Sequence, residues 1–311
     1  SRASRVAYAL PDRMILVYHN ITPPHYFIDV NHTLVQQCFS GRRELTAYID
    51  RCDLALGDSP FNRAELDEIG FPRTGVLPVV PDFNHLNLES NPLLSNSFDD
   101  EWTNILFVGR LIPNKRIEDV IRFFHTYQTR YNQNSRLLLV GSYDGFADYH
   151  ASISALLGRL GTHDVHMVGH VSNEELTAIY NIADLFLSAS EHEGFCVPLI
   201  EAFYKEIPVL AFHAAAIPST MDGAGVLYDH KDPRHVASLM HAVLSDDSLA
   251  DEIIHSQNGA LDRLQAKDFS ATLFNFIDQV KNMPRRSPPR VTWDCWKQFD
   301  LSEKLDELRQ Y

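Results

Sequence analysis

Short apolar runs alternate with longer segments of helical period from residue 104 onward, and this alternation limits the fold more than any other feature of the chain. The pattern predicts a parallel sheet covered by helices. Six strands are expected, at 104–109, 136–141, 164–169, 184–188, 207–211 and 225–228. Three of them end in glycine, at the edge where an open α/β sheet usually receives its ligand.

The first hundred residues predict the same architecture in an incomplete form. Strands are expected at 14–18, 53–56 and 75–80, with helices around 31–50 and 59–69. Three strands make a poor free-standing sheet, so we expect an additional segment or a partner chain to complete this domain.

Polar composition marks the predicted domain boundaries. Residues 81–103 are rich in Asn, Ser and Asp and lack periodicity, which is typical of an interdomain linker. Near the other end, 284–292 breaks the helical pattern and 299–310 restores it. The expected division is therefore a partial N-terminal domain with linker over 1–98, a second domain over 99–283, and a C-terminal tail and helix over 284–311.

Composition excludes several classes of protein. With 311 residues, of which 45% are hydrophobic and 22% charged, the chain should be globular. A formal net charge of −14 disfavours nucleic-acid binding. Four scattered cysteines favour reduced thiols, and no apolar run approaches the ~20 residues that span a bilayer. We expect a cytoplasmic protein with no transmembrane segment.

The stretch 188–202 (SASEHEGFCVPLIEA) is the richest in chemistry. A strand ends near Ser188, and Pro198 suits the first turn of a helix. Glu193 lies in the loop between them and Glu201 in the first turns of the helix. The backbone N–H groups of Gly194, Phe195, Cys196 and Val197 would face an anion or sugar hydroxyls at the helix start. Taken singly, each carboxylate is more often structural than functional.

A second polar loop, GRLIPNK, follows the strand at 104–109. It places Arg110 and Lys115 beside Gly109 at the ligand edge, where two cations can neutralise a diphosphate. The best close acidic pairs, Asp99–Asp100 and Glu174–Glu175, lie in the linker and at a predicted helix start. The sequence therefore predicts no metal site.

In these two loops the chain resembles the retaining glycosyltransferases of family 4, also called glycosyl transferases group 1. These have the GT-B fold, two Rossmann-like domains facing a cleft, and an E-x7-E motif that Glu193 and Glu201 match. The resemblance implies a metal-independent transfer of a sugar from a UDP- or GDP-sugar to the hydroxyl of a saccharide or lipid-linked acceptor, without a cofactor. Such reactions build polysaccharides, lipopolysaccharides or glycoconjugates, and peripheral membrane association is compatible with them.

The resemblance also implies roles for individual residues. Arg110 and Lys115 would hold the donor diphosphate, Glu201 would accept from the ribose hydroxyls, and the backbone at His170 and Val171 would lie against the base. Two residues would be catalytic. Glu193 would orient the sugar, and His19, which ends the apolar run MILVY, would contact the sugar near its reacting carbon. A buried, hydrogen-bonded core histidine stays open as the alternative for His19.

One position departs from the family pattern, because Cys196 stands where glycine is common. This puts the donor's identity in doubt more than the reaction. A non-catalytic nucleotide-sugar-binding domain and a GT-B nucleotide-sugar epimerase stay open as alternatives, and a phosphorylase that uses pyridoxal phosphate is disfavoured, since no lysine stands in a recognisable cofactor motif.

Overall fold

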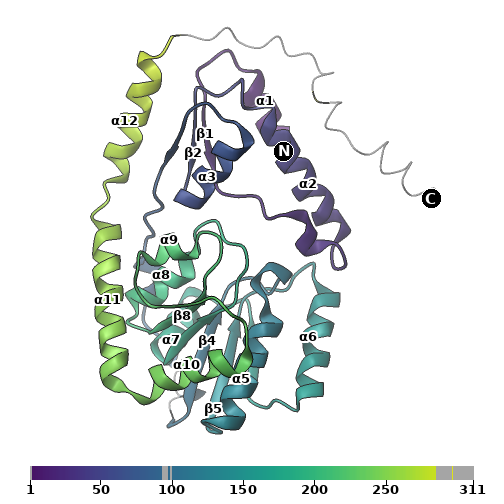
Figure 1. Cartoon of the computed structure of the whole chain (residues 1–311), viewed down its shortest axis with the longest axis vertical. Coiled ribbons are helices and arrows are strands. Elements are labelled where there is room, and N and C mark those ends of the chain that lie inside the picture. The colour runs from purple at the N-terminus through teal and green to yellow at the C-terminus, as the bar shows by residue number, and fades with distance from the viewer. Residues whose placement is uncertain (1, 93–96, 99, 285–295, 297–311) are drawn as a thin grey trace, which may run out of the picture. The chain divides into compact units, whose positions relative to one another are not determined.

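The computed structural model describes residues 2–92, 97–98, 100–284 and 296, which fall into two compact units (Figure 1). The first unit is formed by the described parts of Ser1–Val79 and Asp268–Tyr311, and the second by those of Val80–Lys267. Both units are built on parallel sheets, as the sequence predicts.

The described residues of the second unit form a six-stranded parallel sheet in the order β6-β5-β4-β7-β8-β9. Its strands are β4 (Thr103–Val108), β5 (Ser135–Val140), β6 (Val165–Gly169), β7 (Leu185–Ser188), β8 (Val209–Phe212) and β9 (Val226–Tyr228). Each lies within a few residues of a predicted strand, so the expected parallel α/β sheet is confirmed. The strand order reverses between β4 and β7, which are direct neighbours.

Helices connect and cover these strands. They are α5 (Ile117–Arg130), α6 (Ala147–Leu160), α7 (Asn173–Asn181), α8 (Val197–Tyr204), α9 (Ile217–Met221), α10 (Pro233–Ser245) and α11 (Asp247–Gln265). In Figure 1, α5 runs beside α10, and α8 lies beside α9. One core joins the sheet to α7, α8 and α11 through fully buried side chains such as Leu106, Ile179 and Phe203.

Glycine is required where β4 and β5 end. Gly141 has a φ of 142°, and a Cβ added there would lie 2.0 Å from the carbonyl oxygen of Gly109. No side chain can occupy that space. The two strand ends therefore approach each other as bare backbone, at the edge that the sequence predicts for the ligand.

The first unit contains a three-stranded parallel sheet, in the order β1-β2-β3, among its described residues. Its strands are β1 (Ile15–Tyr18), β2 (Leu54–Gly57) and β3 (Thr74–Val76). The helices α1 (Arg2–Ala9), α2 (His32–Thr46), α3 (Pro60–Ile69) and α12 (Phe269–Asn282) belong to the same unit, with a short 3-10 turn, η1 (Pro24–Phe27).

The units divide at other places than the sequence indicates. Helix α12 lies in the predicted second domain but packs on the first unit, where Val280 joins a buried cluster with Leu54 and Leu56. Arg13 of the first unit donates to the carbonyl oxygens of Val280 and Met283, the latter at 2.6 Å. An amphipathic pattern shows that a helix has a buried face but not which sheet it covers.

The predicted linker is also more than a connector. Its first part belongs to the second unit, where Leu86 is fully buried and Phe83 stacks on Tyr204 with ring centroids 4.5 Å apart. These apolar anchors are isolated in a polar segment, so they leave no periodic signal. The structure thus moves the first boundary from 98/99 to 79/80. The helix predicted at 299–310 lies outside the described residues.

Within the described ranges, no helix is long and apolar enough to cross a bilayer.

Candidate functional site

The two polar loops singled out in the sequence follow neighbouring strands. One extends from β4 through a 3-10 turn, η3 (Pro113–Lys115), to α5, and the other joins β7 to α8. One backbone and one side-chain hydrogen bond join them: Glu191 N–H donates to Asn114 O at 2.9 Å, and Asn114 Nδ2 donates to His192 O at 3.0 Å. Because the strand order reverses between β4 and β7, both loops lie at the switch point that receives ligands in open α/β sheets.

Lys115 and Glu193 meet at this switch point. The ammonium of Lys115 forms an ion pair and hydrogen bond with Glu193 Oε1, and the side chains are only 17% and 9% exposed. Burial alone would lower the pKa of Lys115, but the Glu193 carboxylate favours the charged form and the net result is a raised pKa. The structure therefore brings together the predicted phosphate-binding lysine and the predicted catalytic carboxylate.

Arg110 belongs to the same β4–α5 loop as Lys115. Its guanidinium carbon is 5.6 Å from the centroid of the Phe146 ring, and the residue is exposed. The positive charge of Arg110 repels that of Lys115 and so opposes the rise in the pKa of Lys115. Arg110 directly follows Gly109, whose φ is 151°. The exposed cation is available to an anion from solvent, whereas the buried one is held by Glu193.

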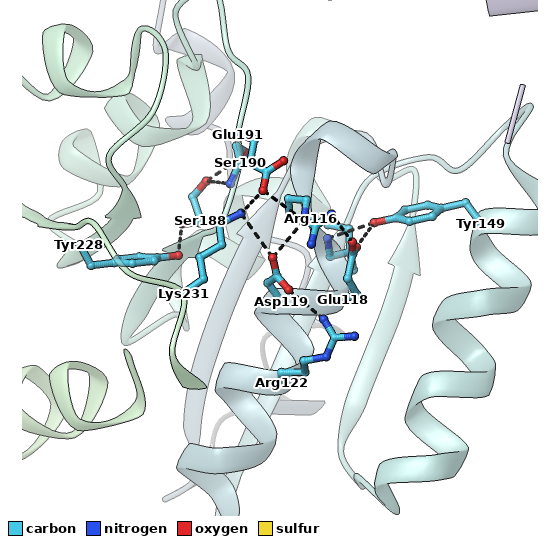
Figure 2. A network of polar contacts seen from close by, with 11 residues as sticks. Arg116, Glu118, Asp119, Arg122, Tyr149, Ser188, Ser190, Glu191, Tyr228 and Lys231 are labelled. Carbon is cyan, nitrogen blue, oxygen red and sulfur yellow. Dashed lines mark hydrogen bonds and ion pairs between the residues drawn. The ribbon is translucent and has the colours of Figure 1, made fainter. Parts of the chain in front are cut away.

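Glu191, two residues before Glu193, belongs to a network of charges shown in Figure 2. Lys231 Nζ lies 2.8 Å from Glu191 Oε1 and 3.3 Å from Asp119 Oδ2. Arg116 Nε lies 3.0 Å from Asp119 Oδ2 and 3.4 Å from Glu191 Oε1. These pairs fasten the β7–α8 loop to the start of α5. They make Glu191 a structural member of the site, and Arg116 and Lys231 were not found by sequence reasoning.

Cys196 caps α8 in a left-handed conformation, with φ 75° and ψ 69°. This backbone region favours glycine, which accounts for the glycine expected at this position. Burial raises the pKa of the Cys196 thiol well above its ordinary value, and the neighbouring Glu193 adds to this. The thiol is therefore a packed, neutral group beside Lys115 and Glu193.

The residues around Cys196 complete the turn into α8. Thr220 donates to Phe195 O at 2.5 Å, and Ala216 N–H donates to Glu193 O at 3.3 Å. Gly194 and Val197 are both partly exposed. In the first turn of α8, Pro198 has no N–H and the N–H of Leu199 donates to Cys196 O at 3.2 Å, so the N–H of Val197 is the donor that this turn offers to a ligand.

Glu201 projects from α8 and is held at both oxygens. Tyr180 of α7 donates to Oε2 at 2.8 Å, and His85 Nε2 lies 2.9 Å from Oε1. Burial and the charge of Glu201 raise the pKa of Tyr180 well above its ordinary value, which keeps its hydroxyl a donor. Sequence reasoning missed His85, because it lies 116 positions from Glu201 in a segment read as a linker.

His170 and Val171 form the short connection between β6 and α7. His170 is exposed, and Val171 packs partly on the core that contains α7 and α8. Ser172 then caps α7 in a capping box with Glu175. His170 and Val171 thus lie at the carboxyl end of β6.

His19 belongs to the first unit and follows β1 directly. Its side chain is 73% exposed, and Nδ1 lies 3.3 Å from Asp58 Oδ2. Asp58 is buried, and burial raises its pKa although Asn62 and His19 oppose the rise through hydrogen bonds. His19 is therefore an exposed imidazole backed by a buried carboxyl group, rather than a buried core histidine.

In the part of the chain that the structure covers, no three His, Cys, Asp or Glu side chains gather in a way that could hold a metal ion. Metal independence stays a prediction.

A sequence model of the family described as "Glycosyl transferases group 1" matches residues 95–258, which contain both loops. The chain belongs to this family. It is 28% identical over 290 residues to O-antigen chain mannosyltransferase B of Escherichia coli, covering 86% of this chain and 74% of that protein. It is 25% identical to the capsular polysaccharide glycosyltransferase CapM of Staphylococcus aureus, covering 64% of this chain and about half (53%) of CapM.

The fold comparison agrees. The structure of Anabaena HepE in complex with UDP-glucose superposes with a TM-score of 0.70 at 18% identity, covering 91% of this chain and 75% of that one. This likeness shows the fold, and the family's GT-B architecture predicted from the sequence is confirmed.

Proposed function

We propose that this chain transfers a sugar from a nucleoside diphosphate sugar to an acceptor hydroxyl, with retention at the anomeric carbon. The observation that carries the proposal is the buried Lys115–Glu193 pair at the switch point, on which the positive charge of Arg110 also acts. In this pair, the Lys115 cation is suited to bind the leaving phosphate, and the Glu193 carboxylate is suited to accept hydrogen bonds from sugar hydroxyls. This arrangement supports the E-x7-E and family 4 assignment made from the sequence.

The leaving diphosphate needs stabilisation as the C1–O bond breaks. Lys115 carries three N–H donors, so it can hold Glu193 and a phosphate oxygen together. Arg110 and the N–H of Val197 at the start of α8 would add donors fixed before the reaction, which is how charge developing in a transition state is stabilised. In this proposal, no metal ion and no cofactor is required.

Glu193 would orient the sugar hydroxyls and stabilise positive charge on the ring. Its fixed contact with Lys115 limits its motion, which favours an orienting role over that of a covalent nucleophile. The leaving phosphate oxygen would help to deprotonate the acceptor on the same face of the sugar. His19, on the first unit, would contact the sugar near its reacting carbon, a role that rests on the family resemblance.

The nucleoside would be held at the other end of the site. Glu201 would accept from the ribose hydroxyls, and the backbone at His170 and Val171 would lie against the base. UDP-glucose is bound in the HepE structure of similar fold, and O-antigen chain mannosyltransferase B is similar in sequence. UDP-glucose and a GDP-linked mannose are therefore the first donors to test, with a saccharide or lipid-linked acceptor from polysaccharide or glycoconjugate synthesis.

The test measures binding before turnover. UDP, GDP and their sugar derivatives are screened for a rise in melting temperature, and the donor that binds is incubated with acceptors while the anomeric configuration of the product is read by NMR. Glu201→Ala should weaken nucleotide binding, whereas Glu193→Ala should spare it and reduce turnover. The opposite pattern would overturn these roles.

Two alternatives give different products. Release of a free epimer without any acceptor would indicate an epimerase. Binding of a nucleotide sugar without turnover on any acceptor would indicate a non-catalytic nucleotide-sugar-binding domain.

A further inference from the structure

His85 is held next to α7 and α8 of the second unit by contacts of the segment in which it lies. It lies in a 3-10 turn, η2 (Asn84–Leu86), whose Leu86 is fully buried. Thr177 of α7 donates to the carbonyl oxygen of His85 at 3.0 Å, and Tyr204 of α8 donates to Asn87 Oδ1 at 2.7 Å. The position of the ring is therefore set by the same two helices that carry Tyr180 and Glu201.

Both ring nitrogens of His85 face acceptors. Nδ1 lies 3.0 Å from the carbonyl oxygen of Asp82, and Nε2 lies 2.9 Å from Glu201 Oε1. The two contacts together fix the orientation of the ring, so that Nε2 holds Glu201 Oε1 in one position.

We propose that His85 is a positioning residue of the donor site, which orients the carboxyl group of Glu201 toward the ribose of a nucleoside diphosphate. Tyr180 fixes one carboxylate oxygen and His85 the other. Each oxygen keeps a further lone pair for a hydroxyl donor. The inference rests on the proposed contact between Glu201 and the ribose, and it adds a residue from the connecting segment to that contact.

The experiment compares the affinity for UDP and GDP with that for their 2′,3′-dideoxy analogues. The ratio of the two affinities isolates the hydroxyl contacts from the diphosphate and the base. Two hydroxyls on a charged acceptor should make the ribonucleotide bind roughly tenfold or more tightly in the wild type.

His85→Ala should reduce this ratio several-fold and leave the affinity for the dideoxy analogue unchanged. His85→Gln keeps an N–H donor and should recover part of the preference. If His85→Ala melts too low to be measured, His85→Leu fills the volume without a donor and replaces it. Tyr204→Phe is the matched control, because it loosens the same segment without touching the ring, and its ratio should equal that of the wild type.

The outcomes separate this inference from the proposed function. Equal weakening of both ligands by His85→Ala would show a merely structural residue, and tighter ribonucleotide binding would show a competitor of the ribose; either overturns the inference. Glu201→Gln tests the ribose contact itself. If this variant loses the preference for the ribonucleotide over its dideoxy analogue while His85→Ala keeps it, only the role of His85 is overturned. The absence of any preference in the wild type would overturn the proposed ribose contact and this inference with it.

Discussion

The polar residues at the ends of the two sheets are held in different ways. In the second unit the acidic side chains of the site have partners within the unit: Glu193 pairs with Lys115, Glu191 with Lys231, and Glu201 is held by Tyr180 and His85. In the first unit, His19 is 73% exposed and has one long contact to Asp58. The proposed donor site in the second unit is thus held by ion pairs and hydrogen bonds, whereas the histidine proposed to contact the sugar is exposed.

Among variants that test this difference between the two units, the largest effect on turnover and stability is expected for Lys115. Lys115→Met should lower turnover by about 10³-fold, because a fixed donor to the leaving phosphate is lost. It should also lower the free energy of unfolding by about 3 kcal/mol, since Glu193 is left buried and unpaired. Initial rates with saturating donor and urea unfolding measure the two effects.

The double variant Lys115→Met/Glu193→Gln separates chemistry from packing. Without an unpaired charge, its unfolding free energy should return most of the way to that of the wild type, while turnover stays low. If Lys115→Met alone keeps its turnover, the pair is structural and the comparison between the two sheets loses its functional meaning.

His19 should show the reverse behaviour. His19→Ala should lower turnover by about tenfold, the effect of one hydrogen bond to a polar or charged partner. The melting temperature should stay within about 1 °C, because substitutions of exposed side chains are nearly neutral. His255→Ala, an exposed histidine on α11, is the control and should change neither value. A marked loss of stability in His19→Ala would place His19 in the same class as Lys115.

The charge network of Figure 2 gives a test of stability alone. Lys231 is 17% exposed and contacts both Glu191 and Asp119, so Lys231→Met should lower the free energy of unfolding by about 2 kcal/mol. The matched control is Lys281→Met on α12, where Lys281 and Asp278 are 67% and 65% exposed; its effect should be below about 0.5 kcal/mol. Denaturant unfolding measures both, and equal effects would show that the network does not fasten the loop.

Much of this architecture was readable in the sequence because its signals are local. The apolar runs and terminal glycines predict β4, β5 and β6, and two polar loops after strands predict that Lys115 and Glu193 share one edge. The pairs that sequence reasoning missed join distant positions. Lys231 reaches Glu191 from 40 positions away, and His85 reaches Glu201 from 116. Neither belongs to a periodic pattern, and single anchors such as Leu86 do not reveal where a polar segment packs.

The smallest effect concerns the backbone of Cys196, where this chain departs from the glycine of its family. Cys196→Ala and Cys196→Gly both remove the thiol, so their difference reports the left-handed conformation at φ 75°. The relief of backbone strain by glycine should exceed its entropic cost. The free energy of unfolding of Cys196→Gly should therefore be about 0.5 to 1 kcal/mol higher than that of Cys196→Ala.

Ala202→Gly, inside α8, has the opposite backbone requirement and should destabilise the protein by about 1 kcal/mol. Thermal and denaturant unfolding of these variants measure how much the backbone conformation at the start of α8 contributes to stability, in addition to the ion pairs of the proposed donor site. If Cys196→Ala proves as stable as Cys196→Gly, the turn into α8 is unstrained, and the ion pairs alone distinguish the two sheets.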